Sequence, residues 1–244
     1  MLRSLLSVPA DRPEDFDAAR SAGADGLCFD LEDAVPVAEK AKARSVVAHV
    51  LESWRSPVPL WVRVNAVDSG LCADDLDAIA RPALAGVQLP KAESAEDVRT
   101  VDRLLAGHER ARSLGPGSIG VIATIESARG LLDVLEVATA APRVVALMPA
   151  IGAGGDLQRD LGYVTTDDER GMLHARSRVV LAARAAGIVP LDGVHVDVGL
   201  VGFERSATAA RRLGFRGKKV FHHEHVEPAN RIFGDEGDSS QDRT

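Results

Sequence analysis

The sequence predicts a single (βα)8 barrel, a TIM barrel of parallel strands, and three observations carry that prediction. The chain has 244 residues, which is close to the ~250 residues that such a barrel takes as one domain. Short apolar runs alternate with amphipathic stretches along the whole chain, as expected when strands and helices alternate around a parallel sheet. The apolar runs also lack a clean inside–outside alternation, which is typical of strands buried on both faces.

The predicted strands are short runs, most of them rich in Val, Ile, Leu or Phe. In chain order they cover residues 4–8, 26–31, 60–65, 86–89, 119–125, 144–148, 191–196 and 219–221. Strands that alternate with helices indicate βαβ units of a parallel sheet, and eight such units in 244 residues predict a closed barrel.

Helical periodicity marks residues 38–54, 94–114, 131–140 and 166–186. The second of these stretches opens with Ser94 and carries Glu96 and Asp97 in its first turn, a good N-terminal signal, and the last ends before Gly187. A doubly wound open sheet is the competing architecture. No GxGxxG follows the first strand, which disfavours dinucleotide binding.

Composition places the chain among globular proteins and excludes several classes. Apolar residues make up 45% and charged residues 27%. A net charge of −7 gives no support for a nucleic-acid-binding surface, and no apolar run approaches the ~18 residues of a membrane span. Two cysteines fit a reducing cytosol, so we expect a cytoplasmic protein. The barrel domain is expected over residues 1–233, followed by a disordered acidic tail over 234–244.

Barrel enzymes assemble their sites at the carboxyl ends of the strands. That rule turns the strand prediction into a set of polar candidates: Asp30, Glu32, Asp33, Arg63, Asn65, Lys91, Glu126, Ser127, Asp156 and His222. Asp192, His195 and Asp197 on the seventh run are candidates for indirect support.

Glu126 and Asp156 follow consecutive strands, so their carboxylates are predicted to converge above the barrel. Two hard oxygen ligands with open positions for water and substrate suit Mg2+, with Mn2+ as a second choice. The structural alternative is that Glu126 makes a buried ion pair and that Asp156 caps a helix at Leu157.

Arg63 lies between apolar neighbours, where its guanidinium can bind a carboxylate or carbonyl oxygen through two parallel donors. Asp30, Glu32 and Asp33 are expected to hold Arg63 and metal-bound waters in place. Alternatively, Arg63 forms only a structural pair with Glu32 or Asp33, or the three acids cap the helix after Pro36.

Lys91 follows a strand end, where a lysine with a lowered pKa can attack a carbonyl. The nearby acids Glu93, Glu96 and Asp97 are expected to keep the lysine charged, so a supporting role beside Asp30 and Glu32 is favoured over a Schiff base.

The histidines His222, His223 and His225 suggest a zinc cluster. Because adjacent side chains of a strand point to opposite faces, the start of a surface helix, or a single ligand-facing histidine, is the better interpretation.

Seven motifs in order then resemble a known family, the HpcH/HpaI aldolases and citrate lyase beta subunits (CitE-like CoA-ester lyases). They are RSLLSVP from Arg3, DLEDAV from Asp30, RVN from Arg63, LPK from Leu89, IESA from Ile125, GDL from Gly155 with DLG from Asp160, and GFRGK from Gly214. The likeness runs from Arg3 to about Phe233.

The resemblance implies a homotrimeric or hexameric barrel with Mg2+ on Glu126 and Asp156, and with Arg63 binding the substrate oxygens. It also implies cleavage or formation of a carbon–carbon bond beside a carbonyl, in a 3-hydroxyacyl-CoA such as citryl-, malyl- or citramalyl-CoA. An enolate formed in this way is stabilised by a metal and a guanidinium. Arg63 and Glu126 are thus the expected substrate-binding residues.

The sequence departs from the family pattern at three places. Ala153 stands where the family has glycine, FHHEH from Phe221 replaces the usual IHPxQ, and few polar residues follow Phe233 where such lyases often carry an acid-bearing segment. The catalytic base is therefore expected to be Asp33 or a metal-bound water. A CoA-free aldolase of 2-oxo acids and a catalytically silent subunit or scaffold are the competing functions.

Overall fold

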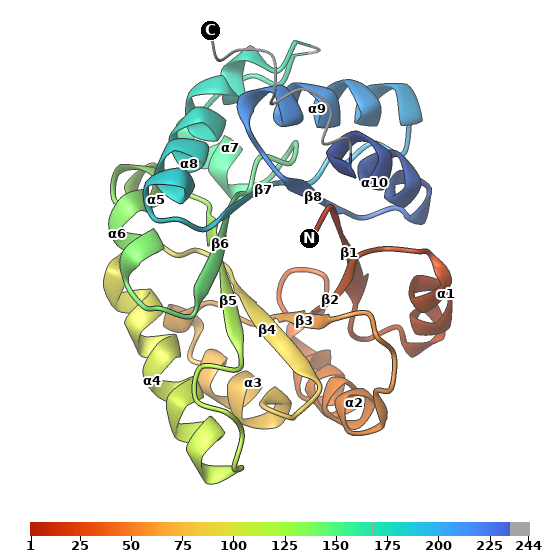
Figure 1. Cartoon of the computed structure of the whole chain (residues 1–244), viewed down its shortest axis with the longest axis vertical. Coiled ribbons are helices and arrows are strands. Elements are labelled where there is room, and N and C mark those ends of the chain that lie inside the picture. The colour runs from red at the N-terminus through yellow and green to blue at the C-terminus, as the bar shows by residue number, and fades with distance from the viewer. Residues whose placement is uncertain (167, 235–244) are drawn as a thin grey trace, which may run out of the picture.

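A computed structural model describes residues 1–166 and 168–234 of the chain. Its strands form one closed parallel barrel in sequence order, in which the last strand pairs with the first. Figure 1 shows the strands as a central ring with the helices outside it. The predicted fold class is confirmed. The strands are β1 (Ser4–Pro9), β2 (Gly26–Asp30), β3 (Leu60–Arg63), β4 (Leu84–Leu89), β5 (Gly120–Ile125), β6 (Val144–Pro149), β7 (Val189–Asp192) and β8 (Gly217–Val220).

The helices connect successive strands on the outside of the barrel. They are α1 (Phe16–Ser21), α2 (Lys40–Ser53), α3 (Cys72–Ile79), α4 (Ala95–Ala111), α5 (Ala128–Leu132), α6 (Val134–Thr139), α7 (Asp156–Leu161), α8 (Leu173–Ala185), α9 (Leu200–Leu213) and α10 (Val226–Gly234). As the sequence signal indicated, Ser94 is the N-cap residue of α4. Its hydroxyl accepts a hydrogen bond from the amide of Asp97, and the Asp97 carboxylate accepts one from the amide of Ser94.

Two apolar layers hold the barrel together. The larger layer fills the space between strands and helices, and a smaller one, which includes Leu5, Cys28, Trp61 and Met148, forms a separate cluster of strand residues. Gly86 lies against Trp61, where a Cβ atom would come within 2.2 Å of the indole ring. A larger residue on β4 would therefore push this indole out of its place.

Two predicted helices differ from the observed ones. The stretch 131–140 divides at Asp133, whose backbone leaves the helical region between α5 and α6. The stretch 166–186 becomes helical only at η4 (Arg170–Met172) and α8. Before it, Glu169 adopts a left-handed backbone (φ +52°) and the Thr166 hydroxyl donates to Asp168. These local bonds compete with the first helical turn.

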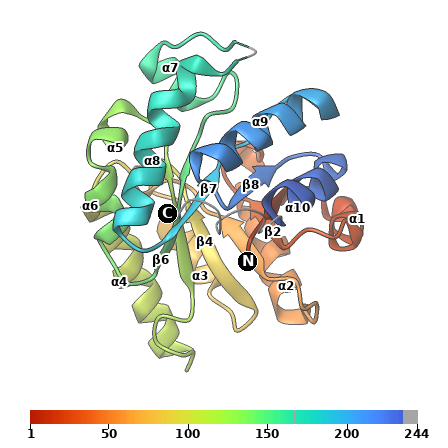
Figure 2. The ribbon, with the colours of Figure 1, turned by 45° about the horizontal axis from the view of Figure 1, so that its top comes forward.

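The seventh strand ends at Asp192, earlier than the predicted end at residue 196. The Asp192 carboxylate pairs with Arg176 of α8, 3.0 Å away, and with Lys218 of β8. Arg176 also donates to Ser206 of α9, so this group lies between the strands and their covering helices, where α8 and α9 pack in Figure 2. Asp192 therefore stabilises the barrel wall and does not support the site from the seventh strand.

The C-terminal boundary needs one correction, because Gly234 is the last residue of α10 and not the first of a tail. The rest of the predicted tail, residues 235–244, lies outside the described part. Among the described helices, none combines the length and the apolar character that crossing a bilayer requires.

Candidate active site

The carboxyl ends of the strands surround a pocket of about 610 Å3. Its walls bring together most of the acidic candidates with Arg63. The lining residues include Asp30, Asp33, Arg63, Glu126 and Asp156, the loop from Gly152 to Gly155, Arg159, and the apolar side chains Pro9, Ala34, Val194, Val196 and Phe221.

Arg63 is the last residue of β3, and the strand register places it opposite Asp30 of β2. Its Nε donates to Asp30 Oδ1 at 2.9 Å, a second bond joins the same two side chains, and Nη1 lies 2.8 Å from Glu32 Oε2. Asp33 is farther away, at 3.7 Å. Burial opposes the charge of Arg63, but Asp30 and Glu32 outweigh it and raise the pKa of the guanidinium. The group is held charged and in a fixed orientation.

The three acids thus surround Arg63, as the sequence predicted, and they do not cap the following helix. Pro36 occupies the cap position of the short helix η2 (Val37–Glu39), without a side-chain hydrogen bond. Burial raises the pKa of Asp30, but the charge of Arg63 and its hydrogen bonds lower it further, so the net shift is downward. Burial is the stronger effect at Glu32 and raises its pKa.

Glu126 follows β5 and is 6% exposed. It accepts one hydrogen bond, from the backbone amide of Lys91 at 3.2 Å. Within the described residues no basic side chain pairs with it, which rules out the buried ion pair considered above. Burial, and then the charge of Glu32, raise the pKa of Glu126 to about 7. A buried carboxylate with so little compensation is poised to accept a cation.

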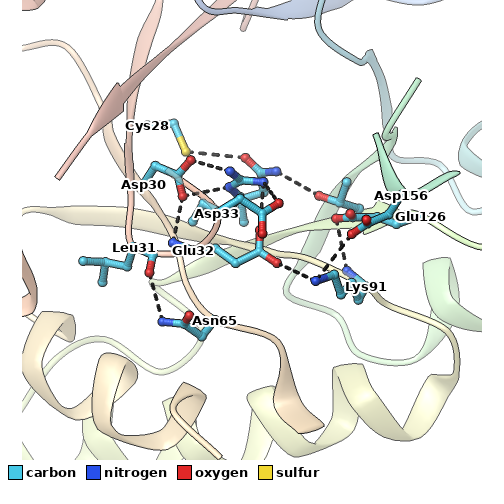
Figure 3. A network of polar contacts seen from close by, with 12 residues as sticks. Cys28, Asp30, Leu31, Glu32, Asp33, Asn65, Lys91, Glu126 and Asp156 are labelled. Carbon is cyan, nitrogen blue, oxygen red and sulfur yellow. Dashed lines mark hydrogen bonds and ion pairs between the residues drawn. The ribbon is translucent and has the colours of Figure 1, made fainter. Parts of the chain in front are cut away.

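Asp156 is the first residue of α7, and Gly155 occupies the cap position, so Asp156 is not the helix cap. The loop before it depends on glycine, because Gly154 has a φ of +76° and a Cβ on Gly155 would lie 2.9 Å from the carbonyl of Gly152. The carboxylate pairs with Arg159. Figure 3 shows Asp156 and Glu126 beside each other, so their predicted convergence is confirmed.

Lys91 lies between Glu32, which pairs with Arg63, and Asp156, which lies beside Glu126. Its Nζ is 3.2 Å from Glu32 Oε1 and 3.4 Å from Asp156 Oδ2. These carboxylates, with Asp33, outweigh burial and raise the pKa of the ammonium. The prediction of a charged lysine is confirmed, but its acids are not those predicted. Of the predicted acids, Asp97 belongs to the capping box of α4, and Glu96 pairs with Arg103.

Three further candidates have structural partners. Asn65 donates to the carbonyl of Leu31 at 3.1 Å and to Asp75. Ser127 caps α5. His222 lies 3.1 Å from the carbonyl of Val196.

The histidines after β8 form the start of a helix, as predicted, since η5 (His223–His225) leads directly into α10. No set of three or more His, Cys, Asp or Glu is arranged to hold a metal ion in residues 1–166 and 168–234.

Sequence reasoning missed the apolar wall of the pocket and Arg159. Val194 and Val196 follow β7, Phe221 follows β8, and Arg159 is one turn after Asp156 on α7. The rule about strand ends applies equally to apolar residues, but these carry no chemical signal that distinguishes them from core residues.

Acids and an arginine line a pocket at the carboxyl ends of a parallel barrel, which is where barrel enzymes carry their active sites. A family model described as HpcH/HpaI aldolase/citrate lyase matches residues 3–223. The chain belongs to this family, as the sequence motifs predicted.

Relatives of known function are similar over most of the chain. Citrate lyase subunit beta of Escherichia coli is 34% identical over 238 residues, which cover 95% of this chain and 76% of that protein. Human mitochondrial citramalyl-CoA lyase is 30% identical over 229 residues, 90% of this chain and 67% of that protein. The L-malyl-CoA/beta-methylmalyl-CoA lyase of Cereibacter sphaeroides is 33% identical over 255 residues, covering 95% and 78%.

Solved structures agree with this placement. The citrate lyase beta subunit of Mycobacterium tuberculosis complexed with oxaloacetate and magnesium superposes with a TM-score of 0.77 at 34% identity, covering 95% of this chain and 98% of that chain. CitE of the same organism in complex with magnesium, acetoacetate and coenzyme A gives a TM-score of 0.77 at 34% identity, covering 94% and 80%.

Proposed function

We propose that this chain is a Mg2+-dependent carbon–carbon lyase that acts on a 3-hydroxyacyl-CoA bearing a second carboxylate. Citryl-, malyl- and citramalyl-CoA are the substrate types. One observation carries the proposal: the buried Glu126 carboxylate, without a basic partner in the described residues, lines the same pocket as Asp156 and the fixed guanidinium of Arg63. The lyase and coenzyme A complexes among the relatives support the reaction class.

The residues present fit Mg2+. Glu126 and Asp156 supply hard oxygen donors, and neither histidine nor cysteine is among the lining residues. Two carboxylates leave positions for water and substrate oxygens, as is usual for this ion. A divalent charge would also relieve the cost of keeping Glu126 ionised beside Glu32 and Asp156. Bound there, Mg2+ would supply Lewis-acid stabilisation of negative charge that develops on the substrate.

Arg63 is the proposed binding group for the oxygen that becomes the enolate. Asp30 and Glu32 fix its guanidinium before any ligand enters, so no reorganisation is needed when charge develops. Asp30 and Glu32 therefore act through Arg63, and Lys91 acts on Glu32 and Asp156. None of these three supporting residues needs to touch the substrate.

Asp33 is the proposed base in the cleavage direction. Its side chain is 61% exposed and lines the pocket beside Arg63. There it would take the proton of the 3-hydroxyl while the adjacent carbon–carbon bond breaks, and the electron pair of that bond becomes the enolate. The resulting carboxylic acid would then give this proton to the enolate carbon, which yields the thioester product. In the condensation direction the two proton transfers would run in reverse.

Product analysis tests the proposed reaction. Purified chain with Mg2+ is incubated with citramalyl-, malyl- and citryl-CoA and with CoA-free 4-hydroxy-2-oxo acids, and thioester and 2-oxo acid products are measured. Acetyl-CoA release from at least one CoA ester is expected. Pyruvate release from CoA-free substrates alone would establish the rival aldolase. A folded protein without turnover or Mg2+-linked binding of oxalate would indicate a silent subunit or scaffold.

The affinity for Mg2+ is expected to depend on pH through Glu126. Metal ligands must be deprotonated, and the pKa of this carboxyl is raised to about 7 by burial and by neighbouring acids. Affinity should therefore fall about tenfold per pH unit below pH 7 and level off above pH 8. Calorimetric titrations between pH 5.5 and 8.5 measure this, and a flat profile would contradict it.

A cytoplasmic location and a homotrimeric or hexameric assembly complete the proposal. Light scattering after size exclusion tests the assembly.

A further inference from the structure

Lys91 has an unusual backbone for a residue with a long side chain. Its φ is +50°, in the left-handed region that glycine favours. This conformation accompanies two contacts from one residue: the backbone amide donates to Glu126 Oε1 at 3.2 Å, and the side chain lies between other acids. Strain of this kind persists where the surroundings over-determine it, commonly at functional sites.

The ammonium of Lys91 joins the two halves of the acidic site. Glu32, at 3.2 Å, belongs to the half that holds Arg63, and Asp156, at 3.4 Å, belongs to the half with Glu126. Figure 3 shows Lys91 between Glu32 on one side and the neighbouring Glu126 and Asp156 on the other. The lysine side chain is 40% exposed, so it has room to turn away from these carboxylates.

We propose that Lys91 is a positioning residue with two separate actions on the site. Its amide fixes Glu126, and its ammonium is a built-in counter-cation that competes with a divalent cation for Asp156 and the charge of Glu32. Lys91 thus sets the affinity of the pocket for the metal. The inference rests on the metal site of the proposed function but not on the reaction.

Simple electrostatics gives the direction of the effect. A positive charge within contact distance of a carboxylate repels a second cation that approaches the same carboxylate. Glu32 is 6% and Asp156 28% exposed, so solvent and salt screen this repulsion less than they would between fully exposed charges. Removing the ammonium while the backbone is kept should therefore tighten metal binding. Replacing it with another cation should not.

The experiment is a calorimetric titration of Mg2+ into the full chain at pH 8, without substrate. Lys91→Met is expected to bind Mg2+ roughly tenfold more tightly than the wild type, which corresponds to about 1.4 kcal/mol. Lys91→Arg, which keeps the charge, should stay within about twofold. The matched control is Lys42→Met, because Lys42 pairs with Glu39 on an exposed face of α2 and should not affect binding.

Lys91→Gly provides a second variant should methionine impair folding, since glycine adopts a φ of +50° without strain. It should also bind Mg2+ more tightly than the wild type. Unchanged or weaker binding by both folded variants overturns the proposal, and so does an absence of Mg2+ binding in all variants. Mg2+ binding that tightens in Lys91→Met while no substrate is turned over supports the role of Lys91 and contradicts only the lyase function.

Discussion

Glu126→Gln is expected to abolish metal-dependent turnover. The substitution keeps the shape of the side chain but removes the negative charge of the proposed ligand. Losing a group that stabilises developing charge costs roughly 10^2- to 10^3-fold in rate, and loss of the metal itself adds to this. Measurement of kcat/KM at saturating Mg2+, with calorimetry for the metal, provides the readout.

The stability of the Glu126→Gln variant shows whether its turnover is lost through the removed ligand or through unfolding. The pKa of Glu126 is raised from 4.5 to about 7 by burial and nearby acids, so its ionised form is disfavoured in the folded chain. Above pH 7 the native state carries this cost, and glutamine does not. Without metal at pH 8, Glu126→Gln should therefore be at least as stable as the wild type.

Glu93→Gln is the control for Glu126→Gln, since Glu93 is an exposed acid on the loop before α4. It is expected to keep full turnover and metal affinity. Asp156→Asn should behave like Glu126→Gln. A folded Glu126→Gln variant with normal metal-dependent activity would contradict the assignment of the ligand.

Arg63→Met is expected to lose both turnover and stability. The turnover is lost because the fixed guanidinium can no longer bind the enolate oxygen. The stability falls because Asp30 and Glu32 are buried and would remain without their main cation. Removing one member of a buried ion pair typically costs about 3–5 kcal/mol. Urea unfolding and steady-state kinetics measure the two effects.

Arg63→Lys distinguishes the two roles of this residue. An ammonium keeps the charge near Asp30 and Glu32 but lacks the planar pair of donors that Arg63 directs at Asp30. We therefore expect a smaller loss of stability than in Arg63→Met, with a fall in kcat/KM of roughly 10^2-fold from misdirected donors. Full activity in this variant would show that only the charge at position 63 matters.

Much of the site was predictable because parallel barrels place the ends of all their strands on one face. Knowing only that Glu126 and Asp156 follow successive strands was enough to predict their convergence. The same rule identified Arg63 and the acids around it. It did not separate Asn65 and Ser127, which follow strands but bond to nearby loop and helix backbone.

The errors in the predicted element boundaries came from local sequence patterns that are compatible with more than one backbone structure. The stretch before α8 contains helix-forming residues, yet the left-handed backbone of Glu169 delays the helix. The end of the seventh strand was predicted too late, because an apolar run does not show where its strand pairing stops. The partners of Asp192 belong to other strands and helices, so no local signal could identify them.

Sequence by itself determined the barrel, the family and the chemical character of the site, since all three depend on residue types and their order. Tertiary structure alone decided the partners of Lys91 and of Glu126. It paired Lys91 with Glu32 and Asp156 instead of with the acids next to it in the chain, and it left Glu126 buried with one backbone donor. The physical reason is that electrostatic energy depends on distance and burial, and both are set by how eight strand ends meet around one pocket.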